Sequence, residues 1–228
     1  MKIGDLEQYC VPNKEATWYD KEEHKLKLKR IEGIRTKKAI EESKKESVPV
    51  EKIVEYINEF LNVYDYQDTT LETFELDGTK QEKRGHVLYV KGLEWTAPKG
   101  EKYKIIENGK EYERYRYTYH DKKYDEIQKK FDLKSPNDIV WLKFTKDGYL
   151  GVVAASFDIN YSYEFISGQL LKILNPTKEW DESFVIIVPI NKNILKEKTR
   201  NQIETGIGNY LIQAKNVPII DYYSHNNF

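Results

Sequence analysis

The sequence predicts a mixed α/β protein, in which helices flank a central mixed β-sheet and an N-terminal helical region precedes that sheet. Apolar residues recur with helical spacing over 48–66, so we expect an amphipathic helix there. The apolar runs 139–144 and 184–190 are short, as in strands that are covered on both faces. Helical and strand patterns alternate over 121–228, which is typical of a sheet with helices on its faces.

The chain has 228 residues, which we expect to form a single domain with an N-terminal helical region (1–66), a β-hairpin region (70–120) and a core (121–228). Its 37 basic and 38 acidic side chains nearly cancel, so a nucleic-acid partner has to be argued from local charge. The single cysteine, Cys10, excludes a disulfide framework. Membrane-spanning, signal-peptide and nucleotide-binding patterns are missing, so we expect a cytoplasmic protein without a nucleotide cofactor.

A basic cluster lies in the N-terminal region, within a helix that we expect over 20–46. Its excess of positive charge would suit a phosphate backbone. Acidic residues follow it, so a solvated helix face explains the same pattern. Ser47 is the expected N-cap of the next helix, which would pack on the core or on a second copy of the chain. The basic residues of this cluster are Lys25, Lys27, Lys29, Arg30, Arg35, Lys37 and Lys38.

Strand signals begin at Thr70 and continue through two turns. The first turn is Asp77-Gly78, and the run 87–90 beyond it predicts a strand. The dipeptide Asn108-Gly109 is the strongest hairpin signal in the sequence. We therefore expect a hairpin whose second strand covers 111–119.

This second strand alternates basic and aromatic residues. Arg114 and Arg116 fall on one face of it, and tyrosines fall on the other face. Such a strand could stack on bases or lie along a groove of DNA. It could also be half buried, with its arginines paired to acids on the neighbouring strand. The tyrosines are Tyr115, Tyr117 and Tyr119.

The core contains the best candidate site. A helix over 121–131 is followed by the strand 139–144, and Asp138 stands directly before this strand. A second strand over 149–157 ends at Asp158-Ile159-Asn160. A helix over 165–173 and the buried strand 184–190 come next. Further on, Gly206-Ile207-Gly208 would loosen or cap a late helix, and residues 218–223 resemble a short strand.

This stretch resembles the core of the PD-(D/E)xK nucleases, the superfamily that contains most type II restriction endonucleases. In that family an acid stands at the start of one core strand, and a second acid stands two residues before a lysine on the next strand. Asp138, preceded by Asn137 rather than proline, matches the first acid, and Asp158 matches the second. Asn160 stands at the lysine position. The helix carrying Gly168-Gln169-Leu170-Leu171 and the strand after it match the following elements, so the resemblance covers about 70 of the 228 residues.

The resemblance implies an endonuclease for double-stranded DNA that uses Mg²⁺ and works as a homodimer on a palindromic sequence. Asp138 and Asp158 would hold Mg²⁺, because carboxylate oxygens are its preferred ligands. Asn160 would orient water, and Glu164 would be a further ligand or base. Since Asn160 has no positive charge, Lys143 or Lys172 would have to supply it. The basic cluster and the Tyr/Arg strand would contact DNA.

A second interpretation of the same residues needs no metal. Asp138 would cap a strand, and Asp158 with Asn160 would form a turn before a helix. The protein would then be a non-catalytic DNA- or protein-binding protein, on a degenerate nuclease fold. The missing lysine and proline favour this interpretation. The discriminating feature is the pair Asp138 and Asp158, whose carboxylates must converge in an enzyme.

Overall fold

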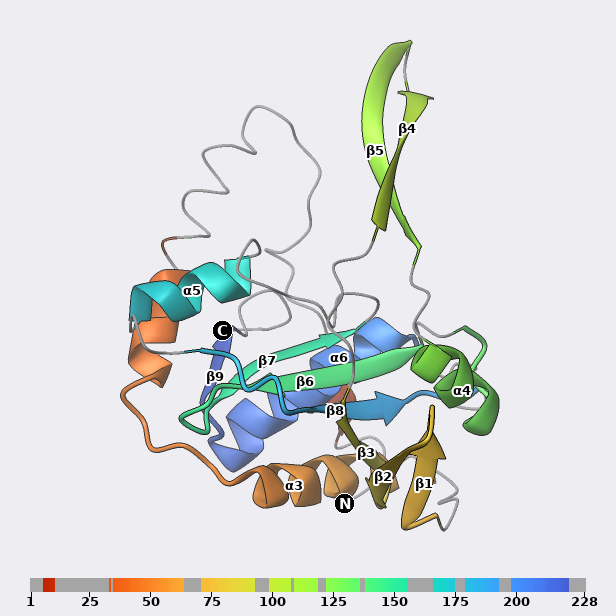
Figure 1. The fold of residues 1–228 in the computed structure, drawn as a ribbon. Coiled ribbons are helices and arrows are strands. Elements are labelled where there is room, and N and C mark those ends of the chain that lie inside the picture. The colour runs from red at the N-terminus through yellow and green to blue at the C-terminus, as the bar shows by residue number, and fades with distance from the viewer. Residues whose placement is uncertain are drawn as a thin grey trace.

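The computed structural model describes residues 6–10, 33, 35–63, 71–92, 99–107, 109–118, 122–135, 138–155, 166–174, 179–192 and 198–221. It contains a mixed seven-stranded sheet with helices on both faces, so the expected α/β class is confirmed (Figure 1). Among the described residues, no helix has the length and apolar character needed to span a membrane.

The large sheet has the strand order β1-β2-β3-β8-β6-β7-β9. Neighbouring strands are antiparallel except β7 and β9, which are parallel. The strands are β1 (Thr73–Leu76), β2 (Thr79–Arg84), β3 (Val87–Lys91), β6 (Ile139–Phe144), β7 (Leu150–Ala155), β8 (Phe184–Pro189) and β9 (Ile219–Asp221). Because β1–β3 join β6–β9 in one sheet, the expected hairpin region 70–120 is divided between this sheet and a separate hairpin.

The two central strands are the apolar runs that the sequence singles out. Every residue of β6 and β8 is buried, because helices cover both faces of the sheet at its centre. Each residue of such a strand contributes apolar surface to one core or the other, and this burial is the main source of the stability of the sheet.

One face of the sheet is covered by α3 (Val50–Asn62) and α6 (Arg200–Asn209), together with the short helix η1 (Gln8–Cys10). The helix α3 begins after Pro49, which occupies the cap position, so Ser47 is not the cap that the sequence predicts. Pro49 is extended and its carbonyl accepts the first helical bonds, from the amides of Lys52 and Ile53, so the helix can start only after it.

The glycines of α6 lie inside the helix and do not cap it, so the capping part of that prediction is wrong. A side chain at Gly206 would place its Cβ 2.6 Å from Cζ of Phe60 and 2.8 Å from Sγ of Cys10. Glycine is required here because α3 and η1 approach the helix this closely. The π-helical turn η4 (Tyr210–Ala214) continues α6 and leads to β9.

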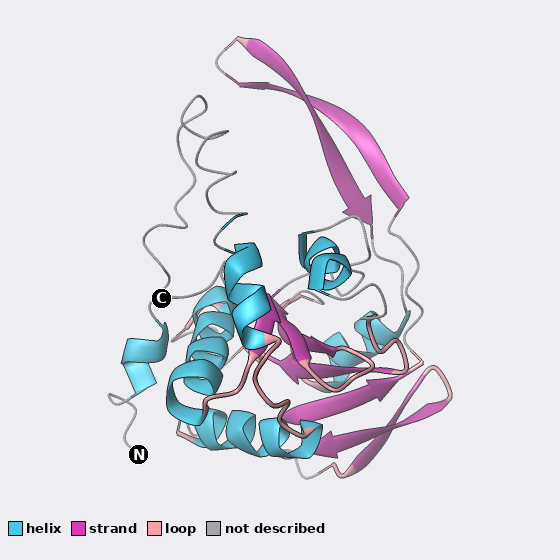
Figure 2. Cartoon of the chain, turned by 90° about the vertical axis from the view of Figure 1, so that its left-hand side faces the viewer, coloured by secondary structure: helices cyan, strands magenta, loops and turns pink. Residues whose placement is uncertain are grey.

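The other face carries α4 (Lys122–Lys130), α5 (Ile166–Leu174) and the helical residues 35–42. These helices bury a second core, which includes Trp141, Trp180 and Ile127. Figure 2 shows the resulting three layers, with the sheet between helices. The rest of the helix expected over 20–46 lies largely outside the described residues.

The hairpin forms a separate two-stranded sheet of β4 (Lys99–Glu107) and β5 (Lys110–Thr118). The turn at Gly109, with φ +73°, confirms the hairpin predicted from Asn108-Gly109. The two strands contact chiefly each other and project from the rest of the molecule (Figures 1 and 2). The exposed side chain of Ile106 lies near its tip.

Candidate functional site

Asp138 stands directly before β6, at one end of the central sheet. Its amide donates a 3.0 Å hydrogen bond to the carbonyl of Ser135, and its carbonyl accepts a 2.8 Å bond from the amide of Ile190. The loop after α4 and the end of β8 therefore both hold its backbone. The position of the carboxylate is set by two elements that are far apart in the sequence.

The carboxylate of Asp138 is mostly buried, with 12% of the side chain exposed. Its Oδ2 has no hydrogen-bond partner among the residues that the structure describes. Its Oδ1 lies 3.9 Å from Nη1 of Arg200, the first residue of α6, which is longer than a hydrogen bond. A buried carboxylate oxygen without a donor is costly unless a cation or water completes it.

This arrangement fits one ligand of a hard cation such as Mg²⁺, which prefers carboxylate oxygens. One carboxylate is not a complete site. In the part of the chain that the structure describes, no three His, Cys, Asp or Glu side chains form a group that could hold a metal ion. The expected partners Asp158, Asn160 and Glu164 lie outside the described residues.

The pairing of β6 with β7 bears on where a second carboxylate could come from. Val140 pairs with Ala155, so the start of β6 and the end of β7 lie at the same end of the sheet. Asp138, directly before β6, therefore lies at the end of the sheet where β7 ends. In the sequence, Asp158 follows the last residue of β7 by three positions.

The two lysines proposed from the sequence to replace the family's lysine do not lie beside Asp138 on its face of the sheet. Lys143 lies five residues along β6, about 17 Å at the usual rise of a strand, and belongs with Trp180 on the opposite face. Its Nζ lies 3.2 Å from Oε2 of Glu182. Burial lowers the pKa of Lys143, and the nearby Glu182 only partly opposes this effect. Lys172 is exposed on α5, which covers that opposite face as well.

Two residues of the basic cluster form ion pairs with acids of the fold. Arg35 forms a bidentate pair with Asp221 of β9, with Nη2 2.6 Å from Oδ2 and Nε 3.0 Å from Oδ1. Lys38 lies 3.3 Å from Oε1 of the buried Glu42, and Lys37 is exposed. The other members, Lys25, Lys27, Lys29 and Arg30, lie outside the described residues.

Arg114 and Arg116 are both residues of β5, and the register of the hairpin gives their partners on β4. In the register of the two strands, Arg114 is opposite Tyr103 and Arg116 is opposite Glu101. Opposite residues share a face of a two-stranded sheet. Pairing of these arginines with acids and their contact with DNA both stay predictions.

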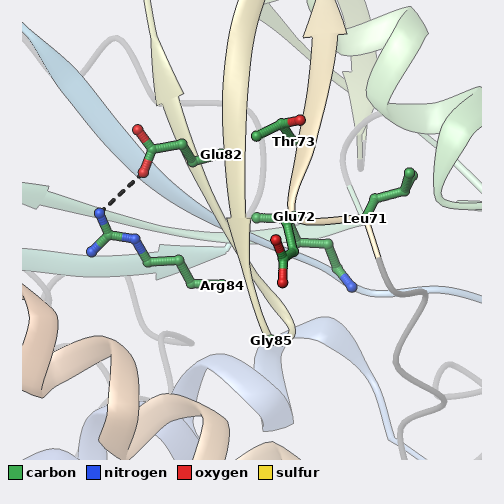
Figure 3. A pocket seen from close by; sticks show the side chains of 7 residues that line it. Leu71, Glu72, Thr73, Glu82, Arg84 and Gly85 are labelled. Carbon is green, nitrogen blue, oxygen red and sulfur yellow. Dashed lines mark hydrogen bonds and ion pairs between the residues drawn. The ribbon is translucent and has the colours of Figure 1, made fainter.

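A polar pocket of about 530 Å³ opens beside β1 and β2 (Figure 3). Two acids and two bases line it, and Arg84 is joined to Glu82 by an ion pair of 3.0 Å. Small-molecule sites are mostly apolar, whereas Leu71 is the one large apolar residue in this lining. The pocket opens at the same end of the sheet as Asp138, since Arg84 pairs with Val87 and β3 pairs with β8.

Arg200 is the residue of this site that the sequence argument missed. One signal was available: Thr199 and Gln202 form a capping box, a pattern that predicts the start of a helix there. Nothing in the sequence places that helix start next to Asp138, because the approach depends on how α6 crosses the sheet.

No protein-family model matches the chain, and searches of curated proteins and of solved structures find no match. The resemblance to the PD-(D/E)xK nucleases therefore depends on individual residues and on the order of the elements.

Proposed function

We propose that the protein is a Mg²⁺-dependent endonuclease that cuts double-stranded DNA at a specific sequence and acts as a homodimer. The observation that carries this proposal is the carboxylate of Asp138. It is buried at the end of a central strand, one of its oxygens has no hydrogen-bond partner among the described residues, and a guanidinium lies 3.9 Å from the other. A cation site beside a basic group suits a phosphodiester substrate.

The order of the elements supports the same proposal. The strands β6 and β7 form an antiparallel pair, the helix α5 follows, and β8 returns to pair with β6. Strand, strand, helix and strand occur in this order in the nuclease core that the sequence resembles. Asp138 stands at the expected strand start in this arrangement.

In the proposed reaction, the oxygen of water bonds to phosphorus and the bond from phosphorus to the leaving sugar oxygen breaks. One proton leaves the attacking water, and one proton is taken up by the leaving oxygen, so the reaction consumes only water. Mg²⁺, when bound, supplies a Lewis acid that activates water and offsets the charge of the phosphate. Asp138 holds the cation, with Asp158 as its proposed second ligand, Asn160 as the water-orienting group and Glu164 as a further ligand or base.

DNA contacts are proposed from two surfaces. The hairpin β4–β5 projects from the rest of the molecule as a two-stranded ribbon, an element that the major groove of DNA admits (Figure 1). Its second strand carries Arg114 and Arg116. The basic cluster of the N-terminal region, with Lys37 exposed in its described part, is the other surface.

The first test is cleavage of long phage DNA by the purified protein, with Mg²⁺ and in parallel with EDTA. Discrete fragments that need Mg²⁺ support the proposal, and mapping their ends identifies the sequence that is read. A smear that needs Mg²⁺ indicates a nuclease without sequence specificity. If the DNA of two unrelated phages stays intact, the proposal that the protein is a nuclease is wrong. Light scattering of the free protein tests the homodimer.

The second test is the substitution Asp138→Asn, which keeps the shape of the side chain and removes its charge. We expect cleavage to fall by at least about 100-fold, the effect of removing one strong electrostatic contribution, while DNA affinity measured in EDTA changes little. Asp132→Asn is the matched control, because Asp132 is exposed at the same end of the sheet and pairs with Lys192. Full cleavage by Asp138→Asn would show that the site has been assigned to the wrong residue.

A second candidate function is a non-catalytic DNA- or protein-binding protein. Two sequence observations favour it: Asn160 stands where the nuclease family has a lysine, and Asn137 stands where the family has a proline. On this interpretation the wild-type protein binds duplex DNA, or another protein, without cleaving DNA in Mg²⁺ or Mn²⁺. The phage DNA experiment separates the two candidates, provided that binding is measured on the same DNA.

A further inference from the structure

Hydrolysis of a phosphodiester adds negative charge to the phosphate in the transition state, so a cation beside the metal ligand accelerates the reaction. The sequence has Asn160 where the nuclease family has a lysine. The following inference rests on the proposed function and concerns which residue supplies this missing charge. Lys143, one of the two candidates from the sequence, is bound to Glu182 on the opposite face of the sheet.

The geometry points to Arg200 as the residue that contacts the scissile phosphate and supplies this charge. Its guanidinium approaches the Asp138 carboxylate to 3.9 Å from the same face of the sheet. Thirty per cent of its side chain is exposed, so it borders solvent from which a substrate can enter, whereas only 1% of the Lys143 side chain is exposed.

The start of α6 is held firmly, which fixes the base of the arginine. The Thr199 hydroxyl accepts a 3.2 Å hydrogen bond from the amide of Gln202, and the Gln202 side chain accepts a 2.9 Å bond from the amide of Thr199. The preceding Lys198 pairs with Glu7 at 2.5 Å. A cation whose backbone is fixed before the substrate arrives loses little entropy on binding it.

The two oxygens of Asp138 then have different tasks. Oδ2, which has no hydrogen-bond partner in the described part of the chain, is the ligand for the cation, and Oδ1 faces Arg200. The guanidinium and the metal would repel each other, so Arg200 would weaken the binding of the metal and its role has to be a different one. Its planar fork of donors matches the oxygens of a phosphate.

If Arg200 contacts the phosphate and Asp138 binds the cation, the loss of Arg200 should change the Mg²⁺ concentration needed for cleavage in a definite direction. Removing Arg200 removes a positive charge beside the metal ligand, so the Mg²⁺ concentration for half-maximal cleavage should stay the same or fall. If Arg200 served only to position Asp138, its loss would loosen the carboxylate and that concentration would rise. The sign of the change therefore separates contact with the phosphate from a positioning role.

The experiment compares the wild type, Arg200→Ala, Arg200→Lys and the control Arg84→Ala in the full-length protein. Arg84 lies on β2, at the same end of the sheet as Asp138. The strand β2 is three strand spacings, or about 14 Å, from β6. We expect Arg200→Ala to lower kcat by about 100-fold, Arg200→Lys to recover about 10-fold of this loss, and Arg84→Ala to keep the wild-type kcat. Thermal unfolding confirms that each variant is folded.

DNA affinity in EDTA provides a readout that does not depend on cleavage. Loss of one phosphate contact should weaken the binding of a labelled duplex by Arg200→Ala and reduce the slope of log affinity against log salt by about 1. A kcat within about threefold of the wild type would overturn the inference, and so would an unchanged salt slope or a raised Mg²⁺ requirement. A wild type that cleaves no DNA refutes the proposed function itself, and that result is read from the wild-type reaction alone.

Discussion

Gly151 of β7 provides the sharpest test of how the second core is packed. It lies in the sheet where the register shifts: Phe144 pairs with Leu150 and Lys143 pairs with Val152, so Gly151 is the extra residue of a bulge. A Cβ added here would lie 2.1 Å from Cζ3 and 2.7 Å from Cη2 of Trp180. The substitution Gly151→Ala therefore pushes directly against a buried indole.

The size of the effect follows from these distances. Carbon atoms in contact are normally about 3.5 Å apart, so the indole has to move by more than about 1 Å. Trp180 is 3% exposed and its ring lies beside the ammonium of Lys143, so it has little room to move. Overpacking of this kind costs about 1–3 kcal/mol, and the gain from restricting the unfolded chain is below about 1 kcal/mol. We expect a net loss of about 2 kcal/mol, which lowers Tm by about 4–8 °C in a protein of this size.

Urea unfolding followed by tryptophan fluorescence measures this loss. Gly33→Ala is the matched control, because Gly33 is exposed, helical and has no atom within 4 Å of an added Cβ; it should gain up to about 1 kcal/mol. The double variant Gly151→Ala/Trp180→Leu removes the opposing ring. In that background Gly151→Ala should cost at least about 1 kcal/mol less than in the wild type.

Two results would refute this reasoning. One is a Gly151→Ala variant whose stability is within about 0.5 kcal/mol of the wild type, the range of ordinary surface substitutions. The other is an equal cost in the presence and absence of the Trp180 ring. In either case the close approach of the indole to the strand would not determine the stability of this core.

Two further predictions concern buried charges. Arg35→Ala should lose about 3 kcal/mol, because it leaves the buried carboxylate of Asp221 without its bidentate partner, whereas Arg35→Met/Asp221→Leu should lose much less; urea unfolding of both variants checks this. Lys143→Met should gain about 1 kcal/mol at pH 7, because Met fills the same space without a buried ammonium and leaves Glu182 about half exposed to water. Burial lowers the pKa of Lys143 below 10.5, so in the alkaline range up to pH 10.5 the unfolded wild type binds more protons than the folded protein, and its stability should rise with pH relative to Lys143→Met. Thermal unfolding of the two proteins at a series of pH values measures that difference, and parallel curves would contradict it.

The elements that the sequence predicts best are those whose burial is nearly complete. The strands β6 and β8 are apolar at almost every position, and the structure buries all their residues. The helix α3 has its apolar residues on one face, and the structure buries Ile53, Val54, Ile57, Phe60 and Leu61 of that face. In both cases the local pattern and the tertiary environment require the same residues, so the pattern is sufficient.

The strand β2 has no such pattern. Its residues Thr79–Arg84 are polar or charged, so no apolar alternation marks them as a strand. Gln81 is nevertheless fully buried, and its side chain bonds both the amide and the carbonyl of Lys91 on β3, at 2.7 and 3.0 Å. Hydrogen bonds to a neighbouring strand stabilise β2, and such bonds cannot be read from local hydrophobicity.

The candidate site shows the same division. Asp138 could be identified from the sequence as a candidate site residue, because an acid before an apolar strand is a local feature. Its contact with Arg200 could not be selected, because it requires α6 to lie across the sheet with its first residue at the start of β6. Arg35 gives the converse case: its sequence context suggests a surface cation, and the structure pairs it with Asp221 of β9.

The sequence by itself determined the α/β class, the amphipathic helix α3, the buried strands β6 and β8 and the hairpin at Gly109, because periodicity, apolar content and turn residues act over a few neighbouring positions. Only the tertiary structure decided which charges meet. Ion pairs and close glycine contacts, such as Asp138 with Arg200 and Gly151 with Trp180, join residues that are distant in the chain. Their formation depends on the packing of whole elements, and no local pattern encodes that packing.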